Sequence, residues 1–576
     1  MRRPRLLITV AVVALLAAGF LFVTLRPEPA PDALTNREPY CVSGEVSVDE
    51  LHIPSGARCE FDPERDSILR VEDGSVLVEG LLKMKPGSGD VIHRLVFENV
   101  DESGFEGAGM GPTSIEDPIL DSDPGLWVMG NGSLDLQGTR RTGWTRDPDQ
   151  AVGWQESDEL RITPTEVEDF ESRPWSMGDP VPQAYPEVPS AEVFNLTRNV
   201  VIEGTPEGNA HVFIRSNEPS TIKFASFEHL GPRCECDASE NAPEEGPITG
   251  RWALHWHHHH GGEGTIVEGT VIQHAPARGY VPHMSNGITF TDTVAHDVDG
   301  AAYWWDPPEE DTDSHTDGTL WDRALASDVR GSSFFLGDSL IPGSNRIVDS
   351  VAAATVPDEF STTTAGFQWG SKGDGVWSTE NIVSHNNRRG IYRWNNHNLL
   401  ELSDETTLYN NHASFIQGAY GSNHLYDGLT LRSDSVIWKT GAGETDDGSY
   451  PTAGIVDFDI DVAGLAEECL HLSGAQVPGG EPTVFRDGSC TGYTGDYAVT
   501  GDILQNKRVF DFVRVTNEQG AQLEPRDFNI SATKADKGLD LIIRVQHEDG
   551  SAYEMVWRGT EPDPRIRRIG AFDSSR

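Results

Sequence analysis

The sequence is short of basic residues. Lys and Arg number 44 against 92 Asp and Glu among 576 residues, which gives a formal net charge of −48 at pH 7. Proteins that bind nucleic acids need basic stripes to neutralise phosphates. Here positive charge gathers only at the N-terminal tip and in the tail at Arg565, Arg567 and Arg568. We therefore expect no nucleic-acid partner.

Familiar catalytic motifs and long helical patterns are also missing. The chain has no G-x-S-x-G, P-loop, dinucleotide-binding or H-E-x-x-H pattern, so these motifs assign no activity. From residue 46 to 138, short alternating apolar runs are broken by Gly, Pro and Asp. Such runs are typical of strands and turns, so the chain is expected to be all-β.

The sequence contains a single long hydrophobic stretch. The uncharged run from Leu6 to Leu25 follows a tip with three arginines, which is the pattern of an export signal. The run is long for a cleaved signal and lacks a clear A-x-A site, which favours an uncleaved anchor with the rest of the chain outside. Cleavage is the alternative. We expect a signal anchor or signal peptide at residues 1–26 and a linker at 27–45, which places the protein on the extracellular face of a membrane or outside the cell.

Cysteines are few, and in an exported chain six of them indicate disulfides rather than a metal framework. Cys41 and Cys59 are about one hairpin apart, and so are Cys469 and Cys490. These two pairs are the predicted bridges. Cys234 and Cys236 are too close together to bridge easily, and their pairing stays open.

Repeats organise the second half of the chain. A block with an apolar residue, then His, Asn or Asp three residues later, then Gly or small residues before an aromatic or apolar pair, begins at these positions: Val271, Val294, Leu325, Ile382 and Leu408. A period in the twenties with short β-branched runs is typical of a stacked solenoid, because one coil cannot bury its strands alone. We predict a right-handed parallel β-helix at 195–515.

The remaining regions follow from composition. A glycine-rich short-strand β domain is predicted at 46–145, an acidic and Pro-rich connector at 146–194, and a C-terminal β segment and tail at 516–576. We expect a monomer.

Histidines cluster at the start of the repeat, where eight of the 19 fall between His255 and His296. Side chains alternate along a strand, so His255 and His257 share one face, and His283 on the next coil can join them. Three imidazoles arranged in this way can bind a divalent transition metal or supply a general base. His274 and His385 are expected to be structural members of a turn ladder, since they share one place in their coils with Asp328 and Asn411.

A second group of candidates lies one coil further on. Carboxylates beside paired aromatics are typical of carbohydrate sites, where rings stack on sugars and a carboxylate acts as acid, base or cation ligand. Asp299 and Asp306 are the candidate carboxylates here, and Trp304 and Trp305 are the candidate stacking residues. Arg278 and Tyr280 are candidates to hold a sugar carboxylate or to act as base and acid of a lyase. The alternatives are that the Trp residues fill the solenoid core and that these residues are ladder neighbours. The acidic residues 309–313 could bind Ca2+ but lack EF-hand spacing, so a solvated loop is expected there.

At these residues the sequence resembles a family of extracellular proteins that combine a domain named for its eight glycines with a parallel β-helix, including fibrocystin and the cell-surface and cell-migration-inducing hyaluronidases. The resemblance covers roughly residues 45 to 310. It is carried by Gly74-Ser-Val-Leu-Val-Glu-Gly80, Leu254-His-Trp-His257, His283-Met-Ser-Asn-Gly287 and Gly300-Ala-Ala-Tyr-Trp-Trp-Asp306.

The resemblance implies binding or cleavage of a polysaccharide outside the cell, with His255, His257, His283 and Asp306 as the positions that carry over. The chain departs from the family in being shorter than the animal members, in the run His258–His260 and in Trp304–Trp305. We therefore predict a glycan hydrolase or lyase on a β-helix, assisted by a divalent metal ion. The alternative is a non-catalytic glycan-binding surface protein.

Overall fold

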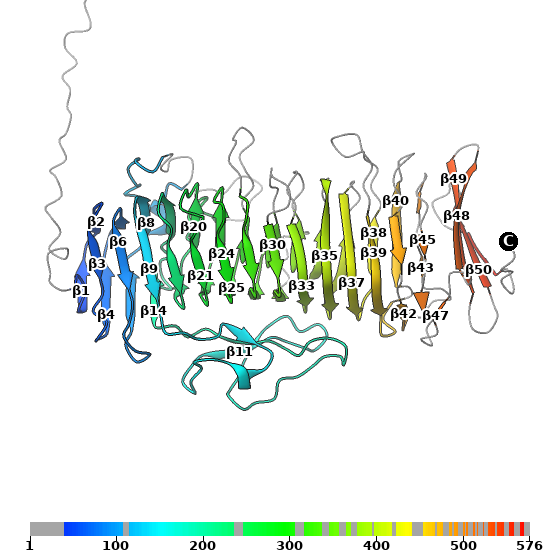
Figure 1. Ribbon diagram of the computed structural model, residues 1–576, viewed down its shortest axis with the longest axis horizontal. Helices are drawn as coiled ribbons and strands as arrows, with labels where there is room; N and C mark the ends of the chain where they lie inside the picture. The colour runs from blue at the N-terminus through cyan, green and yellow to red at the C-terminus, as the bar shows by residue number, and fades with distance from the viewer. Residues whose placement is uncertain are drawn as a thin grey trace, which may run out of the picture.

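Three strands make up each turn of a solenoid in the computed structural model of the chain. Each strand pairs in parallel with its equivalents one turn before and one turn after, and the coils follow one another along the long axis in chain order (Figure 1). The fold is therefore a parallel β-helix, as the repeat predicted.

The structure describes the following residues: 40–107, 114–234, 246–305, 316–336, 345–355, 364–369, 377–393, 397–417, 422–439, 453–466, 469–475, 483–486, 489–492, 499–500, 503–504, 511–512, 515–516, 522–523, 528–535, 538–546, 552–557 and 565–568. The predicted anchor and most of the linker lie outside them. Within these ranges no helix is long and apolar enough to cross a membrane.

The first set of parallel strands is called ladder A. Its members, in order of pairing, are β1 (Gly44–Val48), β4 (Ser67–Val71), β7 (His93–Phe97), β14 (Val200–Glu203), β17 (Ser226–Glu228), β22 (Val271–Ala275), β25 (Val294–Val298), β28 (Leu325–Val329) and β31 (Val351–Thr355).

The second set is called ladder B. Its members are β3 (Arg58–Glu60), β6 (Leu81–Met84), β9 (Ser133–Gln137), β16 (Thr221–Lys223), β21 (Ile266–Glu268), β24 (Thr289–Thr291), β27 (Leu320–Asp322) and β30 (Asn345–Val348).

Ladders A and B then continue together through long bent strands: β33 (Trp377–His385), β35 (His397–Tyr409), β37 (Ser422–Arg432) and β39 (Ala453–Asp461). The last members are β41 (Thr483–Arg486), β42 (Ser489–Thr491) and β45 (Asp511–Phe512).

The third set is called ladder C. Its members are β2 (Leu51–Ile53), β5 (Val76–Val78), β8 (Leu126–Gly130), β15 (Val212–Ser216), β20 (Leu254–His257), β23 (Tyr280–His283), β26 (Tyr303–Trp304), β29 (Phe334–Leu336), β32 (Phe367–Trp369), β34 (Arg389–Arg393), β36 (Ala413–Gln417), β38 (Val436–Lys439), β40 (Leu470–Ala475), β43 (Val499–Thr500) and β44 (Ile503–Leu504).

The ladders run without a break through the region predicted as a separate N-terminal domain. Strand β7 pairs with β14, β8 with β15, and β9 with β16, so residues from 44 onwards already belong to the solenoid. The boundary placed between 46–145 and 195–515 therefore does not divide the sheets. The glycine-broken strands look different in sequence, but they stack in the same way.

The predicted connector is an excursion from one corner of a coil, comprising residues 138–199, between β9 of ladder B and β14 of ladder A. Its strands form an antiparallel sheet in the order β10 (Trp144–Thr145), β13 (Val193–Asn195), β11 (Leu160–Ile162) and β12 (Arg173–Pro174). The excursion also contains a short 3-10 helix, η2 (Pro148–Gln150), whereas a second one, η1 (Glu102–Gly104), lies between β7 and β8. Figure 1 shows the excursion, marked by β11, along one side of the solenoid.

The remaining described strands flank or follow the solenoid. The pair β18 (Arg233–Cys234) and β19 (Gly246–Pro247) is antiparallel, and so is the pair β46 (Val515–Thr516) and β47 (Gln522–Leu523). The C-terminal segment contains an antiparallel sheet of β48 (Phe528–Ala535), β49 (Gly538–Gln546), β50 (Ala552–Trp557) and β51 (Arg565–Arg568).

The core is filled from ladder C by a column of rings. Tyr280, Tyr303, Phe334 and Phe367 stack in sequence with centroids 5.0, 4.6 and 4.7 Å apart and interplanar angles of 10° or less. Small residues fill the facing column of ladder A, which includes Ala295, Ala326 and Ala352. Large residues on one ladder opposite small ones on another keep the interior close-packed.

The corner between ladders A and C uses the left-handed backbone region once per coil. Residues with φ near +55° there are His274, Asp297, Asp328, Ala354, Asn386 and Asn410. Asn and Asp tolerate this conformation better than most residues because their short polar side chains bond locally. The strand register puts Asn386 and Asn410 at this position rather than His385 and Asn411, so the predicted alignment was one residue out in these coils.

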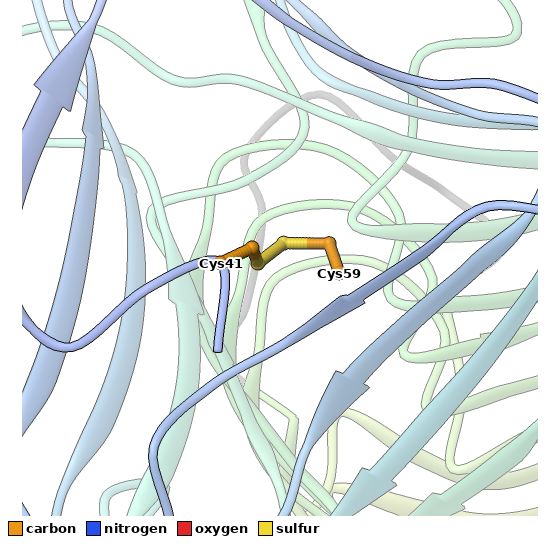
Figure 2. The surroundings of a disulfide bond; sticks show 2 residues. All are labelled: Cys41 and Cys59. Atoms are coloured by element: carbon orange, nitrogen blue, oxygen red, sulfur yellow. A yellow bond between two sulfur atoms is a disulfide. The ribbon is translucent and has the colours of Figure 1, made fainter. Parts of the chain in front are cut away.

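A disulfide staples the first coil. Cys41 and Cys59 are bonded as predicted, with Cα atoms 5.2 Å apart and both side chains buried (Figure 2). Cys469 is also disulfide-bonded. The side chain of Cys490 lies outside those the structure describes, so its pairing with Cys469 stays a prediction.

Candidate functional site

The outer face of ladder A is covered. Outward-facing Val271, Val294, Leu325 and Val351 pack against apolar residues of the excursion, which include Trp144 and Phe194. Burial of this apolar stripe holds the excursion against the solenoid. Over the coils from β22 to β33, ladder A is therefore closed to a ligand.

A buried carboxylate fixes the excursion in place. Glu192 is fully buried and accepts hydrogen bonds from Arg146 Nε at 2.8 Å, Thr163 Oγ1 at 2.8 Å and His385 Nε2 at 2.9 Å. His385 lies on β33 and its ring stacks on Tyr409 at 4.5 Å. Its role is structural, as predicted for a buried solenoid histidine, although its partner is the excursion rather than a turn ladder.

Ladder B presents a charged outer face. Lys223 pairs with Glu268 at 2.8 Å, and the exposed Arg346 pairs with Glu380 at 3.1 Å. Exposed pairs of this kind stay solvated and contribute little to binding or stability.

A cavity of about 390 Å³ lies against the first coils of ladder A, and its lining includes Arg70, Arg94, Glu98 and Glu203. Those charges already neutralise one another, since Arg70 binds Glu98 and Arg94 binds Glu203. The cavity is remote in sequence from every predicted site residue.

The outer face of ladder C is closed in its first coils. Trp127 and Phe213 are buried there, and Arg251 lies over both rings at 4.7 and 5.6 Å. Arg251 Nε donates to Asp123 at 2.6 Å, a pair with both side chains buried. In these coils the outward-facing side chains of ladder C are therefore buried and closed to a ligand.

The predicted histidines come together on the next two coils of the same face. His257 on β20 stands in register with His283 on β23, and their rings stack at 4.8 Å with an interplanar angle of 10°. The ring of His255 is 5.1 Å from His257 and 6.0 Å from His283. The convergence expected from strand alternation is therefore present.

His258 joins this cluster, which the sequence did not predict. Its φ is +48°, so the chain turns at this residue instead of continuing the strand. Its ring lies 4.6 Å from His257 and 5.3 Å from His283, and its backbone N–H donates to the His283 carbonyl at 3.0 Å. Strict alternation would send the side chain after His257 to the opposite face.

The surroundings of His255, His257 and His258 favour the neutral form of these imidazoles. Burial, together with the neighbouring histidines and Arg215, holds the pKa of His257 far below its usual value and lowers that of His258 to about 4. His255 Nδ1 donates to the Gly250 carbonyl at 2.9 Å, which fixes its tautomer. Neutral imidazoles are the form that binds metal ions.

Beyond the histidines, the outer face of ladder C carries a column of four partly exposed side chains, three of them aromatic. Trp304, Phe335, Gln368 and Tyr392 follow one another in register from β26 to β34. Ser332 Oγ donates to the side-chain oxygen of Gln368, which fixes the orientation of the amide. With strands about 4.8 Å apart, the column from Trp304 to Tyr392 spans about 14 Å.

Arginines flank the column. The Arg278 guanidinium lies 3.4 Å from the centre of the Trp304 ring and 4.3 Å from that of Trp252. Arg389 lies 5.5 Å from the Tyr392 ring. The face is thus aromatic and locally basic in a strongly acidic protein.

Other predicted site residues are placed elsewhere. Tyr280 and Trp305 are fully buried, with the Tyr280 hydroxyl bonded to Thr270 and Val294 and the Trp305 indole donating to Thr316 O, so neither can stack on a sugar. Burial also raises the pKa of Tyr280, which argues against a role as acid.

Of the two candidate carboxylates, the structure describes one. Asp299 lies in the turn after β25 and pairs with Arg330, apart from the described histidine cluster. Asp306 lies outside the described residues.

Comparisons with known proteins add little to this picture. No protein-family model matches the chain, and no curated protein matches it either. Among solved structures, one similar chain is a siphovirus 9NA tailspike receptor binding domain, with a TM-score of 0.22 and 8% sequence identity over 91% of this chain and 84% of that chain. The assignment of the β-helix therefore rests on the strand pairing itself.

Proposed function

We propose that the protein is an extracellular glycan-binding β-helix, and that it holds an extended polysaccharide along the outer face of ladder C. The observation that carries the proposal is the column of Trp304, Phe335, Gln368 and Tyr392, which stays partly exposed while the excursion covers the middle coils of ladder A and paired charges occupy ladder B.

The chemistry of the column suits a sugar chain. Aromatic rings present flat apolar faces on which the C–H faces of sugar rings pack, and the amide and guanidinium groups beside them bond to hydroxyls or carboxylates. A length of about 14 Å gives room for several sugar units in line. The buried Cys41–Cys59 bridge is consistent with an oxidising compartment, and the resemblance to extracellular polysaccharide-acting proteins points in the same direction.

The test is a glycan screen with the full chain, followed by titration of the polysaccharide that binds. We expect Tyr392→Ala to weaken binding about tenfold or more, as loss of an aromatic contact does at other interfaces. Arg346→Ala, on the exposed face of ladder B, should bind as the unchanged protein does. Equal affinity in all three proteins would place the ligand elsewhere.

Polysaccharide cleavage is a second candidate function, favoured by the convergence of His255, His257 and His283 on the same face. A hydrolase would add water across the glycosidic bond, whereas a lyase would eliminate the leaving sugar and leave a carbon–carbon double bond. Incubation of the bound polysaccharide should then release new reducing ends, with ultraviolet absorbance only for the lyase. Products that form equally with His257→Ala would contradict a catalytic role for the cluster.

A further inference from the structure

The histidine cluster contains a set of three nitrogen donors that differs from the set predicted from sequence. One ligand nitrogen each from His257, His258 and His283 can be chosen so that all three lie within 4.8 Å of one another. We propose that these three imidazoles form a binding site for a divalent transition-metal ion such as Zn2+, with His258 in the place predicted for His255.

The strand register builds a rigid base for this site. His257 and His283 are direct neighbours across the β20–β23 pair, so their separation is set by ladder hydrogen bonds. Zn–N bonds of about 2.0–2.1 Å place ligand nitrogens about 3.3 Å apart in a tetrahedral site. Bringing the three nitrogens from within 4.8 Å of one another to that spacing requires side-chain shifts on the order of 1 Å.

His258 is brought to the site by a left-handed backbone conformation with φ of +48°. The conformation belongs to a corner of the solenoid, since Met284, which follows His283, has it as well with φ of +44°. Here the left-handed conformation turns the His258 ring back onto the face that His257 and His283 share. The hydrogen bond from its N–H to the His283 carbonyl holds the turn.

A polar atom at the site lacks a protein partner. Nδ1 of His257 is buried and has no hydrogen-bond partner among the described residues. A buried polar nitrogen without a partner is destabilising, and a bound ion would supply the missing partner.

The donor set selects the class of ion. Three imidazoles suit Zn2+, Cu2+, Ni2+ or Co2+, whereas Ca2+ and Mg2+ require oxygen ligands. The described cluster contributes no carboxylate.

Metal titration of the full chain tests the proposal. Protein stripped with a chelator is titrated with Co2+ while its visible absorption is followed, and Zn2+ then competes for the site. We expect one Zn2+ per chain and a loss of affinity on the order of 100-fold in His258→Ala and in His283→Ala. Zn2+ should also raise the thermal unfolding temperature of the unchanged protein but not that of His258→Ala.

His260→Ala is the matched control, because His260 belongs to the same run but is exposed. It should bind Zn2+ as the unchanged protein does. Equal affinity in His258→Ala would overturn the proposal, and so would an equal loss in His260→Ala, which would mean that the run binds metal as an unstructured tag. His258→Ala decides the matter if His283→Ala fails to fold. The site does not depend on glycan binding, so a failed glycan screen leaves this titration unaffected.

Discussion

The buried carboxylate of Glu192 gives the most quantitative prediction. Burial raises the pKa of Glu192, but Arg146, His385 and Thr163 outweigh it and lower that pKa from 4.5 to about 2. A difference of this size between folded and unfolded states corresponds to about 3 kcal/mol of stability at neutral pH. Breaking a buried ion pair by removing one partner costs a similar amount.

We expect Glu192→Ala to release the excursion from ladder A. Hydrogen exchange at pH 7, followed by mass spectrometry, should show residues 163–192 and 383–387 exchanging about 100-fold faster than in the unchanged protein, because about 3 kcal/mol of local opening energy is lost. Exchange in the first coils of ladder C should not change. Glu171→Gln is the control, since Glu171 is exposed in the same excursion and should shift stability by less than about 0.5 kcal/mol.

The same carboxylate makes the attachment of the excursion depend on pH in acid. Because its folded pKa is depressed, the stabilisation is complete above the unfolded pKa of 4.5 and is lost as the pH falls from 4.5 towards 2. Exchange in residues 163–192 should therefore accelerate over this window beyond the ordinary pH effect, and Glu192→Ala should not show that extra acceleration. If Glu192→Ala exchanges at the unchanged rate at pH 7, then Glu192 does not hold the excursion and the reasoning fails.

Three further predictions follow from single contacts. Tyr280→Phe should cost about 1 kcal/mol of stability, seen in denaturant unfolding, and leave glycan affinity unchanged; a loss of affinity would mean that this buried ring reaches the ligand. Cys41→Ser opens a loop of 18 residues and should cost about 3 kcal/mol, with faster exchange confined to the first coils, and an unchanged exchange pattern would contradict its stapling role. His274 bonds to Asp297 at 2.7 Å, which raises the pKa of His274, so its stabilisation holds below pH 6.5 and fades as the pH rises through the folded pKa. A His274 titration by NMR that is the same in Asp297→Asn would exclude that cause.

The fold was largely predictable because every coil of a solenoid must meet the same packing and hydrogen-bonding requirements. Steps of similar length between apolar blocks require strands that stack coil on coil, and Val271 and Val294 do pair in register. What the sequence did not reveal is where one coil departs from the rest. The acidic, Pro-rich composition of residues 146–194 indicated an irregular segment, but composition carries no information on whether the ladders continue across it.

The candidate site was predicted in part. Strand alternation brought His257 and His283 to one face, as the structure has them. Alternation failed at His258, because a left-handed residue reverses it and nothing in a run of histidines marks that turn. Alternation held at Trp304 and Trp305, where one ring faces outwards and the other is buried, and the prediction was wrong in assigning both rings to the ligand.

The remaining residues of the face were missed because they lie beyond the dense histidine signal. Phe335, Gln368 and Tyr392 are 33 and 24 residues apart in the sequence, so no local motif joins them. Only the strand register brings these residues together. An alignment of the apolar blocks of successive coils would reveal them, as the residues that follow the buried apolar residue in each strand of ladder C.

The most direct test of the central claim is to locate a bound polysaccharide on the surface. Hydroxyl-radical footprinting of the full chain, with and without a polysaccharide found by the glycan screen, measures oxidation of each aromatic side chain. We predict protection of Trp304, Phe335 and Tyr392, with no change at Trp154 of the excursion. Protection confined to the excursion or to ladder B, with these three rings oxidised as before, would contradict glycan binding along ladder C.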